Sequence, residues 1–472
     1  MDISDRPPMK ITMKSNQCLN RRLAFLVFLA VVTLLLSSLT GCAGPRKVYS
    51  TVDELNAQGK FNLAHDYVEE HAKDYGKRNR LLYLLDRGMF AFATGEFREA
   101  IAAFTEAEEL ITELYTISLS QEATTFVVND NAAPYRGEDF ESVMVNIFLA
   151  LSYANLSEID EALVEARKVD SKLTAINLQY AENEQNAYRE DPFVRLLMGI
   201  LYEMGGTSSD LNDAYISYSK ALQGYDTEYQ RFGVTFPEPL VENLLSVASF
   251  MGRAELRKVQ RRFPTHRFAS RADRKEMAEV YVLHLNGRTP IKQENVMVVP
   301  TPDGQVVKVA FPSYEKIPGR IVGARLHALP EVGTQQLVAD FRVAEPIGGI
   351  AIENLQNRRV RIYAKTLARV TAKYLAVREA QKQVEDQFGG LAGLLTKVTG
   401  DMLIFVSENA DLRSWRTLPE EILISKITMP PGTYQLWVEC LDASGKFVEK
   451  VELGSRELKA GDKILMQFRS TQ

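Results

Sequence analysis

The stretch LLYLLDRGMFAFATGEFREAIAAFTEAEEL, residues 81–110, decides the fold of the first half of this chain. Its apolar residues recur every three or four positions on both sides of Gly95, a pattern typical of two amphipathic helices joined by a short turn. Gly88 and Ala100 are small enough to let the two helices approach closely, and Phe97 and Phe104 can fill the space beside a neighbouring pair. The stretch therefore predicts a helical hairpin.

The spacing in this stretch resembles that of a tetratricopeptide (TPR) repeat. The positions that carry the resemblance are Leu84, Gly88, Gly95, Phe97, Ala100, Phe104 and Ala107. Three further windows fit the same template less closely, and they are marked by Gly59, Phe61 and Ala64, by Ala150, Tyr153, Ala162 and Ala166, and by Gly199, Tyr202, Ala214, Tyr218 and Ala221. A last hairpin is predicted over residues 240–263. Because one repeat alone buries too little apolar surface, we expect residues 42–270 to stack into an all-α, TPR-like solenoid. An irregular helical bundle is the alternative.

Residues 118–140 are unlike the repeats and end in the polar, turn-forming sequence NDNAAPYRGEDF at 129–140. We expect this insertion to break the helical pattern and to pack on the solenoid as an ordered loop. Its candidate ligand- or partner-binding residues are Tyr135, Arg136, Glu138 and Asp139. The alternative is that Arg136 pairs with the acids and only holds the insertion in place.

Alternating apolar residues replace the helical pattern after a polar run near residues 264–275. Strands are predicted at 279–285, 295–299, 305–311 and 336–343, with a turn at 301–304, and further strands come after residue 419. The second domain, residues 275–472, is therefore expected to be α+β with antiparallel strands and a β-sandwich-like C-terminal part. Cys440 lies in an alternating apolar run, which indicates a small buried residue and not a nucleophile.

A long amphipathic helix is predicted between residues 354 and 387, where Val360, Leu367 and Val377 belong to one apolar stripe. Its basic residues indicate a solvated face, or contact with lipid headgroups. Residues 388–406 are apolar and glycine-rich, but Lys397 and Asp401 favour a buried or interfacial helix over a membrane span.

Arg413, Trp415 and Arg416 come after this apolar segment and form a second group of candidate binding residues. An aromatic face between two fixed cations can contact carbohydrate, carboxylate or peptide. Packing of the tryptophan against the long helix is the structural alternative.

The N-terminus is typical of a targeting segment. A basic, polar stretch precedes an apolar run at 23–36, which is shorter than the roughly 20 residues that a membrane-spanning helix needs. Leu39-Thr40-Gly41-Cys42 resembles the lipobox of bacterial lipoproteins. The resemblance implies that residues 1–41 are a cleaved signal peptide and that Cys42 carries acyl chains that anchor the protein to a membrane. Ala43 after the cysteine implies the outer membrane.

Charge and composition argue against several classes of function. Residues 1–41 carry a net charge of +3, so their removal changes the formal charge from −5 to −8, and no basic field for nucleic acid remains. The five histidines show no metal-ligand spacing, and neither a nucleophile elbow nor a phosphate-binding glycine loop occurs. The sequence predicts no metal site, no cofactor and no enzymatic activity.

The chain resembles a bacterial family of TPR-containing lipoproteins that has no assigned activity. The features that carry this resemblance are the lipobox, the repeats, the insertion and the ADLRSWRTLP segment at 410–419. The resemblance implies a location in the cell envelope. We expect a non-enzymatic adaptor that binds an envelope protein or peptide through the helical repeats and the membrane through Cys42. One alternative is an enzyme acting on cell-wall or surface glycan through carboxylates near residues 129–141. Another is a membrane-remodelling or pore-associated protein that uses residues 388–406.

Overall fold

The computed structural model describes residues 43–125, 131, 133–178, 188–301, 306–390, 393–394, 396–400 and 408–472. The chain divides into two compact units, Met1–Thr51 and Val52–Gln472. The predicted signal peptide and Cys42 lie outside the described residues. In the first unit, only the start of helix α2 (Ala43–Ala57) is described. The second unit contains the remaining helices and all of the described strands.

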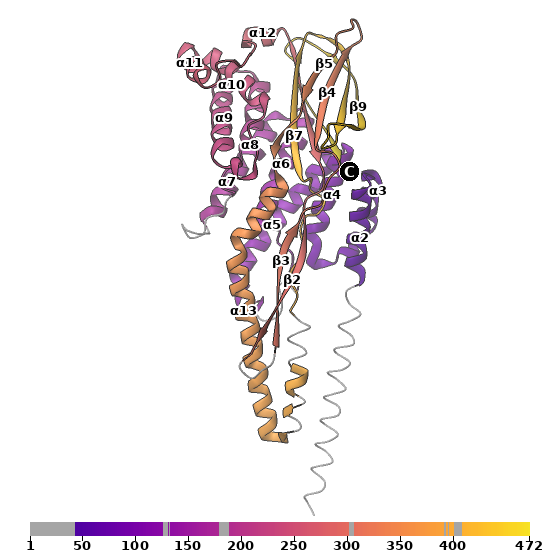
Figure 1. Cartoon of the computed structure of the whole chain (residues 1–472), viewed down its shortest axis with the longest axis vertical. Coiled ribbons are helices and arrows are strands. Elements are labelled where there is room, and N and C mark those ends of the chain that lie inside the picture. The colour runs from indigo at the N-terminus through magenta and orange to yellow at the C-terminus, as the bar shows by residue number, and fades with distance from the viewer. Residues whose placement is uncertain are drawn as a thin grey trace, which may run out of the picture. The chain divides into compact units, whose positions relative to one another are not determined.

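Helices fill the first half of the second unit (Figure 1). After α2 they are α3 (Phe61–Glu70), α4 (Arg80–Thr94), α5 (Phe97–Thr125), α6 (Asp139–Asn155), α7 (Ile159–Leu178), α8 (Pro192–Gly205), α9 (Ser208–Thr227), α10 (Glu238–Met251), α11 (Arg253–Arg262) and α12 (Arg271–Lys275). Short 3-10 turns lie at Ala72–Tyr75, Lys77–Asn79 and Tyr229–Phe232. Helices thus occur in every window that the sequence marked.

Two of the helical pairs make the same close contact. In the pair α4–α5, a Cβ atom on Gly88 would lie 2.5 Å from the ring of Phe104, and in the pair α8–α9 a Cβ atom on Gly199 would collide with the ring of Tyr218. Gly95 ends α4 with a positive φ of 86°, which a glycine adopts without strain. Small residues and turn glycines therefore perform the packing roles that their spacing predicted.

Burial alternates between the helices of each pair. Residues 143–152 of α6 and 196–203 of α8 are buried without a break, so these helices have no exposed face over those stretches. The second helices, α5, α7 and α9, bury only one side. The first helices are therefore covered on both sides, by their partner helices and by the second half of the chain. We call α4, α6, α8 and α10 the inner helices.

The start of the insertion was predicted wrongly. Helix α5 continues to Thr125, although a break was expected from residue 118. Residues 126–130 and 132 lie outside the described part of the chain. The remainder runs through Tyr135 to Glu138, after which α6 begins.

Two four-stranded sheets form the second half. One has the strand order β10 (Lys463–Ser470), β1 (Ala278–Asn286), β7 (Glu421–Met429), β6 (Arg342–Glu345), and the other β5 (Leu337–Asp340), β4 (Gly323–Pro330), β8 (Gly432–Leu441), β9 (Phe447–Leu458). Their facing sides share one apolar core, in which Val280, Leu326, Leu436 and Cys440 are fully buried. The chain is thus a mixed protein with helices in its first half and sheets in its second, and Cys440 is the buried apolar residue that was expected.

The sheets correct three expectations. β1 and β10 pair in parallel, with Val280 opposite Ile464, whereas only antiparallel strands were predicted. The sandwich is also not confined to the C-terminal part. Strands β1, β4, β5 and β6 belong to its two sheets, although they precede the long helix in the sequence. Strand β4 was not predicted at all. The helices of the first half end at Lys275 and the strands begin at Ala278, and both halves lie in one compact unit.

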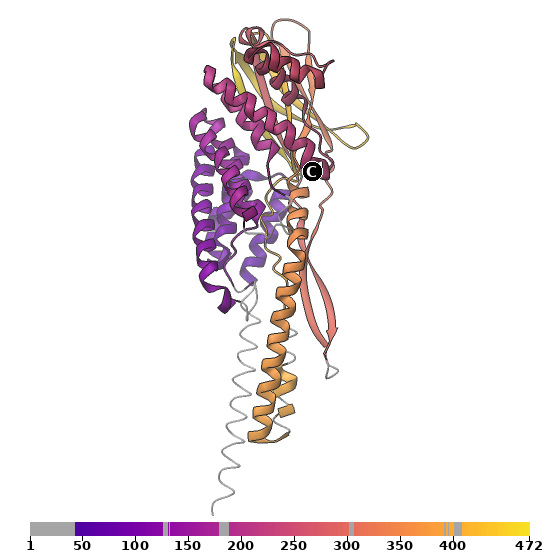
Figure 2. The same ribbon diagram turned by 90° about the vertical axis from the view of Figure 1, so that its left-hand side faces the viewer.

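Helix α13 (Ile347–Phe388) is 42 residues long. Figures 1 and 2 both show it beside the two-stranded hairpin of β2 (Ile291–Pro300) and β3 (Val306–Glu315), and Phe311 of β3 meets Tyr363 edge to face at 4.5 Å. The helix was predicted correctly, but its single apolar stripe was not. Val360 is 76% exposed, while Arg369 is buried and pairs with Glu408. Within the described residues, each helix is too short or too polar to cross a bilayer.

Candidate functional site

The two predicted groups of binding residues meet. Glu141, in the first turn of α6, accepts three hydrogen bonds: from the Tyr135 hydroxyl at 2.5 Å, from the Glu138 amide at 3.0 Å and from the Trp415 amide at 2.7 Å. Two segments about 270 residues apart in sequence are therefore joined through one fully buried carboxylate. We call this contact the junction.

Glu141 is central to the junction, yet it was not among the predicted residues. Burial raises its pKa to about 7, against the effect of the donors from Trp415 and Tyr135. A local signal existed, since Glu138-x-x-Glu141 has the spacing of a capping box, in which the third helical residue accepts the N-cap amide. The bond from the Glu138 amide to the Glu141 side chain is that interaction.

Glu138 lies among cations. Its carboxylate contacts Lys292 of β2 and Arg358 of α13, and the Glu138 side chain is 11% exposed. Lys292 also donates to the carbonyl oxygen of Arg413 at 2.9 Å. Burial, followed by the charge of Arg136, lowers the pKa of Arg358 to about 10. Glu138 therefore holds the hairpin, the long helix and the insertion together.

The other predicted residues differ in exposure. Arg413 pairs with Asp411 at 2.7 Å, donates to the carbonyl oxygen of Ala133 at 3.0 Å and lies over the Tyr135 ring at 5.3 Å. Arg416 pairs with Asp53 of α2. Arg136 is exposed, and the half-buried Asp139 is the first residue of α6. Of the predicted set, Arg136 is the side chain most open to solvent.

Trp415 is packed inside the protein. Its side chain is 1% exposed, and its ring lies 5.7 Å from Phe104 and 5.9 Å from Phe148, measured between ring centroids. The indole nitrogen donates to the Thr417 hydroxyl at 2.9 Å, and that hydroxyl donates to Asp86 of α4 at 2.8 Å. The structure therefore packs the ring against α5 and the inner helix α6 and not against the long helix, and a sugar or peptide cannot reach it.

The buried Asp86 leads to a prediction about pH. Burial raises its pKa to about 7 from an ordinary 3.8, so the folded state holds this proton more tightly than the unfolded chain does. The resulting stability is present at low pH and is lost as the pH rises from about 4 to about 7. In Asp86→Asn the side-chain oxygen can still accept from Thr417, the amide can donate to the Tyr75 hydroxyl in place of accepting from it, and the group has no proton to lose. We expect its free energy of unfolding, relative to the wild type, to rise by about 1–3 kcal/mol across this range, measured by urea unfolding at pH 5 and pH 8.

The control for this prediction is Asp66→Asn, which changes an exposed acid on α3. Its difference from the wild type should be the same at both pH values. An Asp86→Asn difference that is also independent of pH would contradict the raised pKa.

One cluster resembles a metal site. His65 and Glu69 of α3 and Glu99 of α5 bring three possible ligand atoms within 4.8 Å of one another. Arg87 contacts Glu69 and lies 2.8 Å from the same Glu99 oxygen that faces His65 at 3.6 Å. The guanidinium already neutralises both carboxylates, and a metal ion would have to displace it. We therefore interpret the cluster as an ion-pair network.

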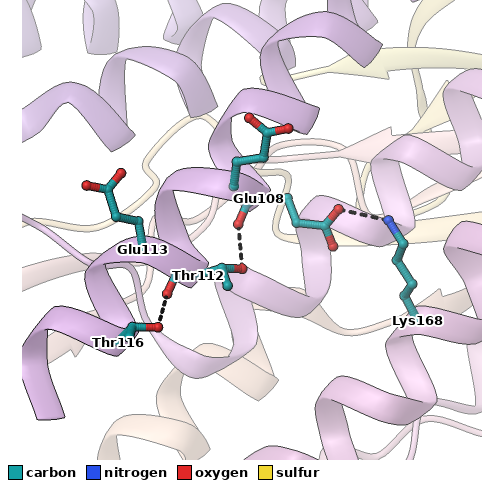
Figure 3. Close-up of a pocket in the computed structure, with 6 residues that line it drawn as sticks. Glu108, Thr112, Glu113, Thr116 and Lys168 are labelled. Carbon is teal, nitrogen blue, oxygen red and sulfur yellow. Dashed lines mark hydrogen bonds and ion pairs between the residues drawn. The ribbon is translucent and has the colours of Figure 1, made fainter.

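A groove of about 510 Å³ opens on the outer side of the helices, lined by Glu108, Glu109, Thr112, Glu113, Thr116 and Lys168. Figure 3 shows Lys168 of α7 reaching Glu108, while the Glu113 carboxylate lies away from both. Burial acts to raise the pKa of Glu108, but the charge of Lys172 and a hydrogen bond from Asn146 lower it to about 2. Glu109 and Glu113 are exposed. We call this the α5–α7 groove.

A second hollow of about 650 Å³ is lined by Ala254, Arg257, Gln260, Arg261 and Pro264 of α11 and its end. The lining of this hollow is basic, whereas the lining of the α5–α7 groove is acidic. Neither hollow includes any of the residues that the sequence singled out.

A second buried polar cluster links the inner helix α8 to the first sheet. Arg274 of α12 pairs with Glu203 at 2.9 Å and contacts Glu279 of β1. Lys426 of β7 lies 2.7 Å from Glu279, and Lys463 of β10 lies 3.3 Å from Glu203. These acids are no more than 7% exposed. Helices and sheet are thus joined by paired charges as well as by apolar contacts.

Comparisons with known proteins add little. Neither a protein-family model nor a curated protein matches the chain. Among solved structures the chain is similar to BtubC (BKLC) from P. vanneervenii, with 14% identity over 53% of this chain and 89% of that chain and a TM-score of 0.30. A likeness of this size carries no argument about function.

Proposed function

We propose that this protein is a non-enzymatic adaptor of the bacterial cell envelope. In this proposal acylated Cys42 anchors it to a membrane, TPR-like repeats form its helical half, and a basic segment of a partner protein binds in the α5–α7 groove. The observation that carries the proposal is the open acidic groove on the outer helices. Membership of a TPR lipoprotein family belongs to the same proposal.

The charge of α5 supports a basic partner. This helix has glutamates at 99, 106, 108, 109, 113 and 122 and a single cation, Arg98. Glu99, Glu106 and Glu108 pair with Arg87, Arg80 and Lys168 of neighbouring helices, so the acidic field of the groove comes from Glu109 and Glu113. Glu109 and Glu113 face solvent beside the neutral Thr112 and Thr116. Such a field attracts cationic segments, speeds their association and repels acidic ones.

The outer groove is preferred to the inner side of the repeats for a steric reason. The inner helices are covered by residues 411–418 and by the first sheet, through contacts such as Trp415 with Phe148 and Tyr281 with Asn243. A peptide on that side would have to displace the protein's own core, whereas the α5–α7 groove is open as it stands.

The two alternatives gain no comparable support. A glycan-acting enzyme was expected to use Glu138 or Asp139, and neither acid lines either hollow. Glu138 is held by Lys292 and Arg358. In the apolar segment invoked for membrane remodelling, residues 391–392, 395 and 401–406 lie outside the described part of the chain. Both alternatives stay predictions.

Zero-length coupling of carboxylates to amines tests the groove directly. Treating cell envelopes with a carbodiimide should join Glu109 or Glu113 to lysines of one reproducible partner, identified by mass spectrometry. In the double variant Glu109→Gln and Glu113→Gln these crosslinks should disappear, because the amides keep the shape of the groove but cannot be activated.

The matched control is Glu331→Gln with Glu457→Gln, two exposed acids of the sandwich, and it should keep the groove crosslinks. Persistence of the same partner in the groove variant would overturn the proposed contact. The variant Cys42→Ala tests the anchor in the same experiment. It should leave the membrane fraction and lose labelled palmitate. Palmitate labelling equal to that of the wild type would overturn the proposed location.

A further inference from the structure

Helix α11 is strongly basic in a chain that is acidic overall. Its ten residues hold five cations and a single acid, Glu255, whereas the whole chain has a formal net charge of −5. Figure 1 shows α11 at the edge of the helical half, and the helix packs against α10. The charge of α11 is therefore opposite in sign to that of the chain as a whole.

The side of α11 that faces the protein uses two of these charges. Val259 is buried on this side. Near it, Arg262 pairs with Asp226 of α9 at 2.6 Å, and the Tyr215 hydroxyl donates to Glu255 at 2.5 Å. These contacts attach α11 to its neighbours, and they leave the other four cations out.

Those four cations lie on the opposite side of the helix. Arg253, Arg257 and Arg261 recur every four residues and form one row, which we call the α11 ridge, and Lys258 lies beside it. All four are exposed, and none of them pairs with a carboxylate of the described residues. The Arg257 Nε donates only to the carbonyl oxygen of Arg253, at 3.1 Å. Like charges four residues apart on a helix repel each other, so an anion on this side would relieve the repulsion.

The ridge lies beside a concave surface. The hollow of about 650 Å³ is lined by Ala254, Arg257, Gln260, Arg261 and Pro264. A guanidinium group can bind a carboxylate through two parallel hydrogen bonds, which favours arginine over lysine in such a site. Successive arginines of the ridge are four residues apart, about 6 Å along the helix. Alternate residues of an extended peptide are about 6.6 Å apart, which is nearly the same spacing.

We propose that the α11 ridge binds an acidic segment of a second partner protein, whose carboxylates pair with Arg253, Arg257 and Arg261. Three guanidinium groups spread over about 12 Å match a row of carboxylates better than a single small anion. A flat lipid surface matches less well, because it cannot fill the hollow beside the arginines.

This surface and the α5–α7 groove select partners of opposite charge, so the two contacts do not compete. The ridge shares no residue with the groove. The inference therefore goes beyond the proposed function and does not depend on it.

Fluorescence anisotropy of a labelled peptide of alternating glutamate and serine, added to the full chain in neutral detergent, tests the ridge. The peptide should bind, and added salt should weaken the binding because the charges are exposed. The triple variant Arg253→Gln, Arg257→Gln and Arg261→Gln should raise the Kd about tenfold, the sum of three exposed ion pairs. The single variant Arg257→Glu disturbs the helix less and should raise the Kd several-fold.

The matched control is the triple variant Lys60→Gln, Lys77→Gln and Lys446→Gln, which removes the same charge from exposed positions elsewhere and should keep the Kd within about twofold. Circular dichroism checks that each variant is folded. An equal loss in the control and ridge variants would overturn the site, as would a peptide that does not bind the wild type.

Two competitors test the class of ligand. Inorganic phosphate and detergent micelles that contain phosphatidylglycerol should displace the peptide only at concentrations well above that of unlabelled peptide. Displacement by phosphate at the same concentration as unlabelled peptide would assign the ridge to a small anion. The same result with phosphatidylglycerol would assign it to a lipid headgroup. Either result would overturn the protein partner.

Discussion

Arg274→Met should reduce the free energy of unfolding by about 3 kcal/mol, because it leaves Glu203 and Glu279 with one cation fewer in a buried site. Arg274 is 6% exposed and lies between these two acids, which belong to an inner helix and to the central strand β1. Lys426 and Lys463 remain nearby. They limit the loss but cannot take over the two-pronged geometry of a guanidinium.

The same variant should change the titration of Lys426. Burial, and next the charge of Arg274, lower the pKa of this lysine to about 7. Without Arg274 the pKa should rise, so the lysine carries its charge at neutral pH and partly replaces the lost cation. Urea unfolding followed by circular dichroism measures the stability, and Arg257→Met, on the exposed side of α11, is the control that should stay within about 0.5 kcal/mol of the wild type. An equal effect of both variants would contradict the role of the buried cluster.

Trp415→Ala should cost about 3–5 kcal/mol, the range for removing a large aromatic side chain from a packed core. The loss has two sources. The cavity removes the contacts with Phe104 and Phe148, and the Thr417 hydroxyl loses the indole donor that orients it toward Asp86. Since the junction depends on this segment, we expect the helical half and the sandwich to lose their contact before either half unfolds.

Trp437→Ala is a matched control for this prediction, because Trp437 is the other tryptophan of the chain and is only half-buried. Its ring stacks on His327 at 5.1 Å and lies under Lys450, on the outside of the second sheet. Its removal should cost clearly less than that of Trp415 in the same urea titration. If Trp415→Ala costs no more than Trp437→Ala, the junction does not hold the two halves together.

Much of the architecture could be predicted from local patterns. Residues 81–110 predicted the pair α4–α5, and the alternation around Cys440 predicted a strand with that thiol inside the core. Both predictions depend on neighbours close in sequence, whose spacing directly reflects the periods of helix and strand. The same local reasoning failed at residues 118–125, where polar residues lie within a helix that continues α5 to Thr125.

The candidate site was only partly predictable. The sequence marked Tyr135, Glu138 and Trp415, and the structure brings them together, but through Glu141, which looked like an ordinary residue of a helix. Nor could periodicity show that Trp415 is enclosed, or that Arg369 of α13 is buried against Glu408. Each of these facts depends on a partner far away along the chain. The α5–α7 groove likewise arises only when two helices pack side by side.

By itself, the sequence determined most of the helices and strands, with β4 and the end of α5 as exceptions, because hydrophobic periodicity and turn glycines act over a few residues. It also determined the charge of each segment, including the positive charge of α11. Only the tertiary structure decided that β1 pairs with β10, that the inner helices are covered, and which charged side chains are exposed. The physical reason is that burial and pairing depend on the contacts between distant segments, which form when the whole chain packs at once.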